Sequence, residues 1–159
     1  MVEGNGPADD DRGCLRETVI VSACLLGVRC NHEGNANTHD AVVALRDTAR
    51  VVPICPESAG GLPTPRTRAE RRDDGRVVDA NGDDVTEWFA RGAAHAVRLA
   101  EAVGATRAVL KARSPSCGCH EIYDGTFTRT RVAGEGVTAE ALRRAGLEVV
   151  SEDDLTLNG

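Results

Sequence analysis

Residues 18–24 read TVIVSAC, an apolar run rich in β-branched side chains that ends at a cysteine. Such a short, continuous run is typical of a strand that is buried on both faces of a parallel sheet. A second run, Val51–Cys55 (VVPIC), also ends at a cysteine, and Pro53 within it favours an edge strand or a bulge. Two further strands are predicted at Ala108–Lys111 and Glu148–Val150.

Helical patterns separate these strands, at about residues 39–49, 85–103 and 139–145. The middle pattern is the clearest, because its apolar residues recur with a period of 3.6 and Gly104 follows as a C-terminal cap. Asp84 and Glu87 have the spacing of a capping box at its start. The alternation of strands and helices predicts an α/β fold, a single Rossmann-like domain with a mainly parallel sheet flanked by helices. The chain has no G-x-G-x-x-G phosphate loop, so dinucleotide binding is not implied.

The composition fits one domain with an aliphatic core. The chain has 159 residues, of which 41% are hydrophobic and only 3% aromatic, so Val, Leu, Ala and Ile must form the core. Residues 1–16 are polar and acidic and are predicted to be a flexible tail, which leaves residues 17–159 as a single α/β domain. The arginine-dense stretch 66–76 is predicted to be exposed.

Charge and hydropathy argue against several classes of partner. The formal net charge of -6 and a pI near 5.2 disfavour general nucleic-acid binding and membrane-surface binding. No apolar stretch is long enough to cross a bilayer, and the N-terminus lacks the basic and apolar regions of a signal peptide. These features predict a cytoplasmic protein, in which cysteines serve metal binding or thiol chemistry rather than disulfides.

Three cysteines lie where the predicted strands end. Cys24 and Cys55 close the first two strands, and Cys117 follows the third by a few residues. The carboxyl ends of parallel strands share one edge of a sheet, so we expect these thiols to meet in space. Three thiolates favour zinc, copper(I) or an iron–sulfur cluster, and the wide spacing is unlike a zinc ribbon with paired C-x-x-C knuckles. Cys30 and Cys119 are competing ligands.

Three motifs surround these cysteines: Ser22-Ala-Cys24-Leu-Leu-Gly27, Cys55-Pro-Glu57 followed by GGLPTPR at 60–66, and Ser114-Pro-Ser-Cys117-Gly118 followed by Ile122-Tyr-Asp-Gly125. Together they resemble the DUF523 family, which includes the thiouracil desulfidases, over roughly residues 18–150. The resemblance implies a [4Fe-4S] cluster held by three cysteines, matching Cys24, Cys55 and Cys117, with one open iron that binds the substrate's sulfur. The chain departs from the family in the loop at residues 30–34 and in having a cysteine at position 119.

The resemblance also implies the reaction. Sulfur would be removed from a thiolated pyrimidine base or nucleotide, of the 2-thiouracil or thio-UMP type, by non-redox hydrolysis that releases a uracil-type product and hydrogen sulfide. It assigns catalytic roles to Glu57 and Ser114. An open iron would polarise the C=S bond as a Lewis acid, and Glu57 would act as general base on water or as proton donor. Ser114 would position water or an oxyanion, although a turn-forming serine before a proline is the alternative.

Three further residues are candidates for substrate binding: Ser116, Lys111 and Arg66. Lys111 is the chain's only lysine, and a compact charge there can do what arginine cannot. Arg66 begins a group of arginines, with others at 68, 71 and 72, that could hold a nucleotide phosphate. A strand-end surface charge and a solvated loop are the alternatives for these residues.

Two functions of other classes are also compatible with the sequence, besides a desulfidase. One is a non-enzymatic iron–sulfur or zinc module that senses sulfur or metal. The other is a thiol-based sulfurtransferase that carries a persulfide on Cys117. The sequence leaves the strand order and the oligomeric state undetermined.

Overall fold

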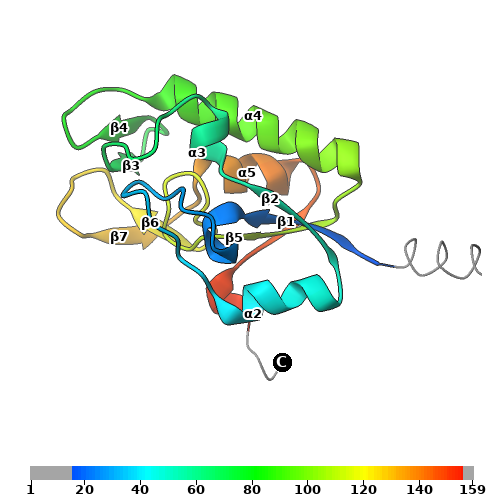
Figure 1. The fold of residues 1–159 in the computed structure, drawn as a ribbon. Helices are drawn as coiled ribbons and strands as arrows, with labels where there is room; N and C mark the ends of the chain where they lie inside the picture. Colours follow the sequence, from blue (N-terminus) through cyan, green and yellow to red (C-terminus); the bar gives the residue numbers. More distant parts are fainter. Residues whose placement is uncertain (1–15, 156–159) are drawn as a thin grey trace, which may run out of the picture.

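The centre of the computed structural model, which describes residues 16–155, is a parallel sheet with the strand order β2-β1-β5-β8 (Figure 1). Its strands are β1 (Thr18–Ser22), β2 (Arg50–Ile54), β5 (Arg107–Leu110) and β8 (Glu148–Ser151). β1 lies inside the sheet and is buried along its whole length, as its uninterrupted apolar sequence predicts. β2 is an edge strand, which explains why it tolerates Pro53. The predicted α/β class and parallel sheet are confirmed.

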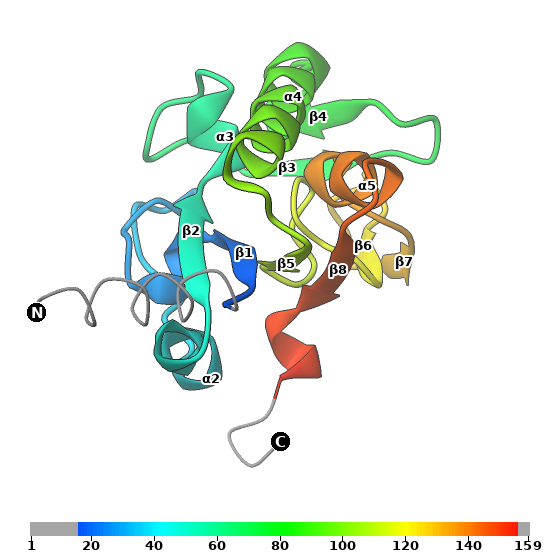
Figure 2. The same ribbon diagram turned by 90° about the vertical axis from the view of Figure 1, so that its right-hand side faces the viewer.

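Helices cover both faces of this sheet (Figures 1 and 2). α4 (Thr86–Val103) and α5 (Val137–Arg144) pack on one face, against a core that includes Ile20 of β1. α2 (Asp40–Val43) and the 3-10 helix η3 (Ala44–Asp47) lie on the other face, against Val19 and Val21. Successive β1 side chains therefore enter opposite cores, which is the period-two geometry of a strand buried on both sides. None of the helices within residues 16–155 has the length and apolarity needed to span a membrane.

Two small antiparallel pairs flank the carboxyl edge of the sheet (Figure 1). They are β3 (Ala69–Arg71) with β4 (Val77–Asp79), and β6 (Glu121–Tyr123) with β7 (Arg131–Ala133). The helix α3 (Pro56–Ala59) follows β2 directly at the same edge. These short elements form walls around the ends of the parallel strands.

The structure corrects two local predictions. The helix predicted at 39–49 is a single α-helical turn that continues as η3, so it is shorter and tighter than expected. The predicted capping box at the start of α4 is absent: the N-cap residue is Val85, which has no capping side chain. Asp84 instead accepts a hydrogen bond from the Thr86 N–H at 2.9 Å, and Glu87 pairs with Arg91 one turn along the helix. The tail predicted at residues 1–16 lies, apart from its last residue, outside the described residues.

Two glycines allow the site-bearing segments to approach the helices closely. A Cβ atom on Gly92 of α4 would lie 2.0 Å from the carbonyl oxygen of Pro56, the first residue of α3. A Cβ atom on Gly136, the N-cap of α5, would lie 2.4 Å from the carbonyl carbon of Ser116. Real Cβ atoms do not approach backbone so closely, so side chains at both positions would push these segments away. The glycines thus fix the distance between the helices and the loops that carry the predicted site.

Candidate active site

A cavity of about 520 Å³ opens at the carboxyl edge of the parallel sheet. Its volume is within the range of small-molecule sites. The loops after β1, β2 and β5 line it together with residues of β3 and β6. All eight predicted site residues contribute to its wall: Cys24, Cys55, Glu57, Arg66, Lys111, Ser114, Ser116 and Cys117.

The three predicted cysteine ligands reach this cavity from three separate connections. Cys24 lies in the 3-10 helix η2 (Ala23–Leu26) just after β1, rather than at the end of the strand as expected. Cys55 follows β2 and is the N-cap residue of α3. Cys117 lies in the turn after β5 and is 3% exposed. The expected convergence of the three thiols is therefore present, while their role as ligands stays a prediction.

Burial favours the protonated form of two of these thiols, Cys24 and Cys117. Burial raises the pKa of Cys117 to about 12, and burial likewise raises the pKa of Cys24. A negative charge on nearby Cys55 would raise the pKa of Cys24 further, and a charge on Cys24 would do the same for Cys117. A coordinated metal supplies the positive charge that such a group of thiolates needs. Ser22 Oγ also donates a hydrogen bond to Cys117 Sγ at 3.2 Å, which stabilises a thiolate there.

The Sγ atoms of Cys24, Cys55 and Cys117 do not all lie within 4.8 Å of one another. With Zn–S bonds of about 2.3 Å, three sulfurs around one tetrahedral ion lie roughly 3.8 Å apart. Within residues 16–155, the group of three potential ligand atoms that all lie within 4.8 Å of one another is formed by Cys119, His120 and Asp154. The three cavity cysteines are thus more widely spaced than a single ion requires. Cys thiolates are the usual ligands of iron–sulfur clusters, which are larger than a single ion.

The two competing cysteines have different positions. Cys30 is buried in the wall of the same cavity, and burial with nearby Cys55 raises its pKa to about 12. Its carbonyl oxygen lies 3.6 Å from Cys55 Sγ. Cys119 does not line this cavity but a second, smaller one. The structure therefore brings Cys30 to the site and leaves Cys119 outside it.

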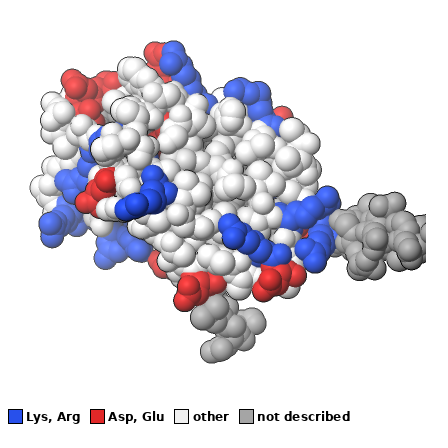
Figure 3. Space-filling model, viewed as in Figure 1, with Lys and Arg blue, Asp and Glu red and all other residues white. Residues whose placement is uncertain are grey.

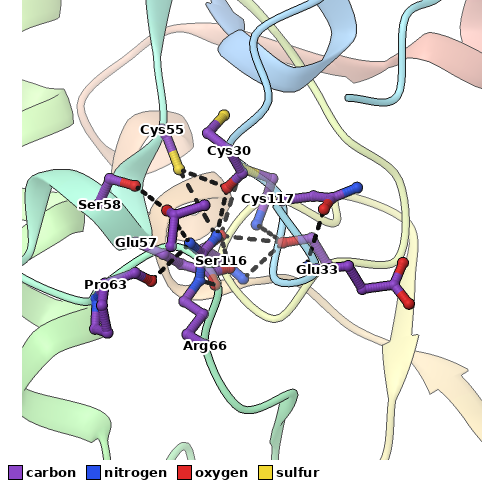
Figure 4. Close-up of polar contacts among 12 residues, drawn as sticks. Cys30, Glu33, Cys55, Glu57, Ser58, Pro63, Arg66, Ser116 and Cys117 are labelled. Carbon is purple, nitrogen blue, oxygen red and sulfur yellow. Dashed lines mark hydrogen bonds and ion pairs between the residues drawn. The ribbon is translucent and has the colours of Figure 1, made fainter. Parts of the chain in front are cut away.

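Glu57 is held at both carboxylate oxygens (Figure 4). Its Oε1 accepts a hydrogen bond from Arg66 Nε at 2.8 Å, and its Oε2 accepts one from Ser116 Oγ at 2.9 Å. The Arg66 side chain is only 6% exposed, so the prediction of an exposed arginine stretch is wrong for this residue. Arg66 is buried because its guanidinium also donates to the Cys30 carbonyl oxygen at 2.8 Å. It therefore orients Glu57 rather than facing solvent.

Ser114 shapes the turn that carries Cys117. Its Oγ accepts hydrogen bonds from the backbone N–H groups of Ser116 and Cys117, both at 3.1 Å, so the turn-forming interpretation is consistent with the geometry. Its Oγ also lies 3.0 Å from Ser116 Oγ. Since Ser116 donates to Glu57, the Ser114 hydroxyl has its own hydrogen free for Ser116. The three side chains form one hydrogen-bonded chain that ends at the carboxylate.

Lys111 is paired at the far wall of the cavity. Its Nζ lies 3.3 Å from Glu152 Oε2 and donates to the Ala112 carbonyl oxygen at 3.0 Å. Glu152 is buried in the 3-10 helix η4 (Glu152–Asp154) and also accepts from the Ala112 N–H at 2.7 Å. The backbone N–H of Lys111 donates to Ser22 Oγ at 2.9 Å, so Ser22 links this strand end to Cys117.

Sequence reasoning missed Ser22 and Glu152 as parts of the site. Ser22 could have been found, because it stands at the carboxyl end of β1 directly before the first cysteine motif. Glu152 lies in an acidic run near the end of the chain, and nothing local distinguishes it from its neighbours. Only the contact with Lys111, which depends on the pairing of β5 with β8, gives it a place in the site.

The cavity has a cationic rim on an acidic protein. Arg68 and Arg129 line it, whereas Arg71 turns away to pair with Glu140 of α5 at 2.9 Å. In Figure 3, Lys and Arg atoms lie on the side where β6 and β7 are found, and others lie at the top and on the opposite side of the same face. Of the four arginines predicted to form a rim, Arg66 and Arg68 line the cavity, whereas Arg71 and Arg72 do not. Arg113 and Arg129 also line it.

Known proteins resemble this chain over most of its length. The family described as 2-thiouracil desulfurase matches residues 19–154. The uncharacterized protein YbbK of Bacillus subtilis (strain 168) is 38% identical over 146 residues, which cover 86% of this chain and 97% of that protein. A solved structure described as the [4Fe-4S]-dependent thiouracil desulfidase TudS is 47% identical, with a TM-score of 0.83, and the match covers 88% of this chain and 93% of that one.

Proposed function

Because the chain belongs to the 2-thiouracil desulfurase family, we propose that it is an iron–sulfur-dependent desulfidase acting on a thiolated pyrimidine base or nucleotide. Water would replace the sulfur, giving a uracil-type product and hydrogen sulfide. The oxygen of water ends in the product and its two protons leave with the sulfur, so the reaction needs no electron donor. The observation that carries the proposal is the convergence of three thiols in one cavity beside a doubly held carboxylate.

Cys24, Cys55 and Cys117 would hold a [4Fe-4S] cluster with one iron free of protein ligands. When bound, this group would supply a Lewis acid that polarises the C=S bond of the substrate. The thiols already lie at the edge of the cavity and two of them are buried, which would exclude water from the cluster. Cys30, which lies in the same cavity wall, is the alternative ligand if one of these three cysteines does not bind the cluster.

Glu57 would accept the proton of the attacking water at Oε2. Its Oε1 accepts a hydrogen bond from Arg66, which fixes the orientation of the carboxylate. Ser116 Oγ, which donates to Oε2, would pass a proton between the carboxylate and the substrate, and Ser114 would hold Ser116 in place. The same carboxylate, once protonated, would return its proton to the departing sulfur.

The cationic rim supports a nucleotide as the substrate. Arg68, Arg129 and Lys111 line the cavity, and arginine binds phosphate through paired hydrogen bonds. We expect thio-UMP to have a higher kcat/KM than thiouracil. Replacing Arg68 or Arg129 by Gln should reduce that preference and leave turnover of the free base unchanged.

The decisive experiment measures iron, acid-labile sulfide and sulfide release on anaerobically purified protein. We expect about four irons and four sulfides per chain, as for such a cluster, and sulfide release from 2-thiouracil or 2-thio-UMP. A cluster without turnover on either compound would support a sensing role. Failure to bind iron after anaerobic reconstitution would refute the proposal.

The sulfurtransferase alternative is disfavoured by the state of Cys117. A persulfide carrier needs an accessible thiolate, whereas this thiol is buried and its pKa is raised to about 12. That alternative predicts activity in iron-free protein, which the same assay tests.

A further inference from the structure

A second group of potential metal ligands lies outside the cavity just described. Cys119 Sγ, a ring nitrogen of His120 and a carboxylate oxygen of Asp154 all lie within 4.8 Å of one another. Cys119 and His120 line a separate cavity of about 290 Å³, whose other walls include β7 and the end of β8. Residues far apart in the sequence thus meet at one place that the proposed desulfidase reaction does not use.

The geometry of this group is held by the surrounding backbone. Asp154 Oδ2 accepts a hydrogen bond from the Ser151 N–H at 2.8 Å, as part of the capping box of η4. The same oxygen lies 2.7 Å from His120 Nε2. The His120 carbonyl oxygen accepts from the Gly134 N–H at 3.1 Å, which anchors the loop to the end of β7. The backbone therefore holds the carboxylate in place, and the carboxylate in turn contacts the imidazole.

The charge around the group favours a cation over an anion. The two arginines in the cavity wall are already paired, Arg113 with Asp153 and Arg131 with Glu121, each at 3.0 Å. Their charges are therefore neutralised within the wall. The Asp154 carboxylate is left as an acidic group beside the thiol and the imidazole.

We propose that Cys119, His120 and Asp154 form a binding site for a divalent cation of the zinc type. A thiolate, an imidazole and a carboxylate together are the ligands that Zn²⁺ accepts, and three protein ligands leave a fourth position for water. Donor atoms around tetrahedral zinc lie about 3.3 to 3.8 Å apart, so the side chains need only small movements. The ion would replace the hydrogen bond between His120 and Asp154.

Such an ion would connect two parts of the fold. Cys119 and His120 lie in the loop that follows Cys117, and Asp154 lies in η4 directly after β8. Zinc would fix this loop to the end of the sheet. It would therefore brace the turn that carries Cys117 without taking part in the reaction.

The site is tested on anaerobic holoprotein, in which the cluster occupies the cavity cysteines. One equivalent of ZnSO₄ is added, and zinc and iron are measured after gel filtration. X-ray absorption at the zinc edge then reports the ligands. We expect one zinc per chain at unchanged iron content, with one sulfur at about 2.3 Å and the remaining ligands nitrogen or oxygen at about 2.0–2.2 Å.

Variants locate the ion. Cys119→Ser, His120→Ala and Asp154→Asn should each weaken zinc binding at least about tenfold, while His95→Ala, an exposed histidine on α4, should leave it unchanged. All three positions are at least partly exposed, and circular dichroism checks that each variant is folded. Loss of the zinc on gel filtration, a shell of three sulfurs, or a zinc affinity in the three variants equal to that of the unchanged protein would each overturn the proposal.

Discussion

Glu57 is the residue on which the chemistry of the cavity depends most, because each of its oxygens has a fixed partner. We expect Glu57→Gln to lower kcat about 10²- to 10⁴-fold with iron and sulfide content unchanged. The reason is that the amide cannot take a proton from water. Glu33→Gln is the matched control, since Glu33 lines the same cavity but its carboxylate points away from Glu57 in Figure 4. Equal losses in the two variants would argue against a base at position 57.

Arg66 is expected to contribute stability as well as orientation. Arg66→Gln leaves a nearly buried carboxylate without its cation, and we expect it to lower the free energy of unfolding by about 3 kcal/mol. The double variant with Glu57→Gln should lose less than the sum of the single variants. Denaturant unfolding of the iron-free protein measures both quantities. The exposed pair Glu87–Arg91 serves as control, with a coupling below about 0.5 kcal/mol.

The two serines of the third motif should differ in what they affect. Ser114→Ala leaves two backbone N–H groups without their acceptor and should destabilise the fold by about 1–3 kcal/mol. Ser116→Ala removes the donor to Glu57 and should lower kcat with a smaller effect on stability. Thermal unfolding and steady-state sulfide release on the two variants separate these roles. Identical effects on both measurements would contradict the assignment.

Among the elements, α3 and α4 are coupled through a glycine. We expect Gly92→Ala to destabilise the protein by about 1–3 kcal/mol, although alanine favours a helix by about 1 kcal/mol. The added Cβ would collide with the Pro56 carbonyl and displace α3, which carries Glu57, so kcat should fall too. Ala94→Gly on the exposed face of α4 should reduce stability by about 1 kcal/mol with unchanged kcat. Unfolding and activity measured on both variants test this coupling.

The elements also show what a sequence can predict. The four parallel strands and α4 follow from local patterns, a continuous apolar run and a 3.6-residue period, and were predicted close to their bounds. The convergence of the cysteines follows from topology, since parallel strands share one edge. The β6–β7 hairpin depends on tertiary contacts and was not predicted, and the helix predicted at residues 39–49 proved shorter than its pattern indicated. The burial of Arg66 could not be predicted from local sequence either. It depends on contacts with Glu57, nine residues away in the chain, and with Cys30, 36 residues away.

In the molecule as a whole, the proposed cluster would link the three segments that follow β1, β2 and β5. Cys24→Ser, Cys55→Ser and Cys117→Ser should each abolish iron binding and activity, because each removes one anchor. Cys14→Ser, outside the described residues, should leave both unchanged. Binding to the folded state alone raises apparent stability by mass action, so the holoprotein should unfold at a higher temperature than the iron-free protein. A cysteine variant that keeps its full iron content would exclude that thiol as a required ligand.

The order of these connections has a consequence for how the protein matures in the cell. Cys24 and Cys55 leave the ribosome well before Cys117, and β8, which pairs with β5 beside the cavity, is made later still. A cluster delivered to the nascent chain would meet two of its three thiols and an unfinished cavity. We therefore expect the cluster to be inserted after synthesis, into a chain that has already folded.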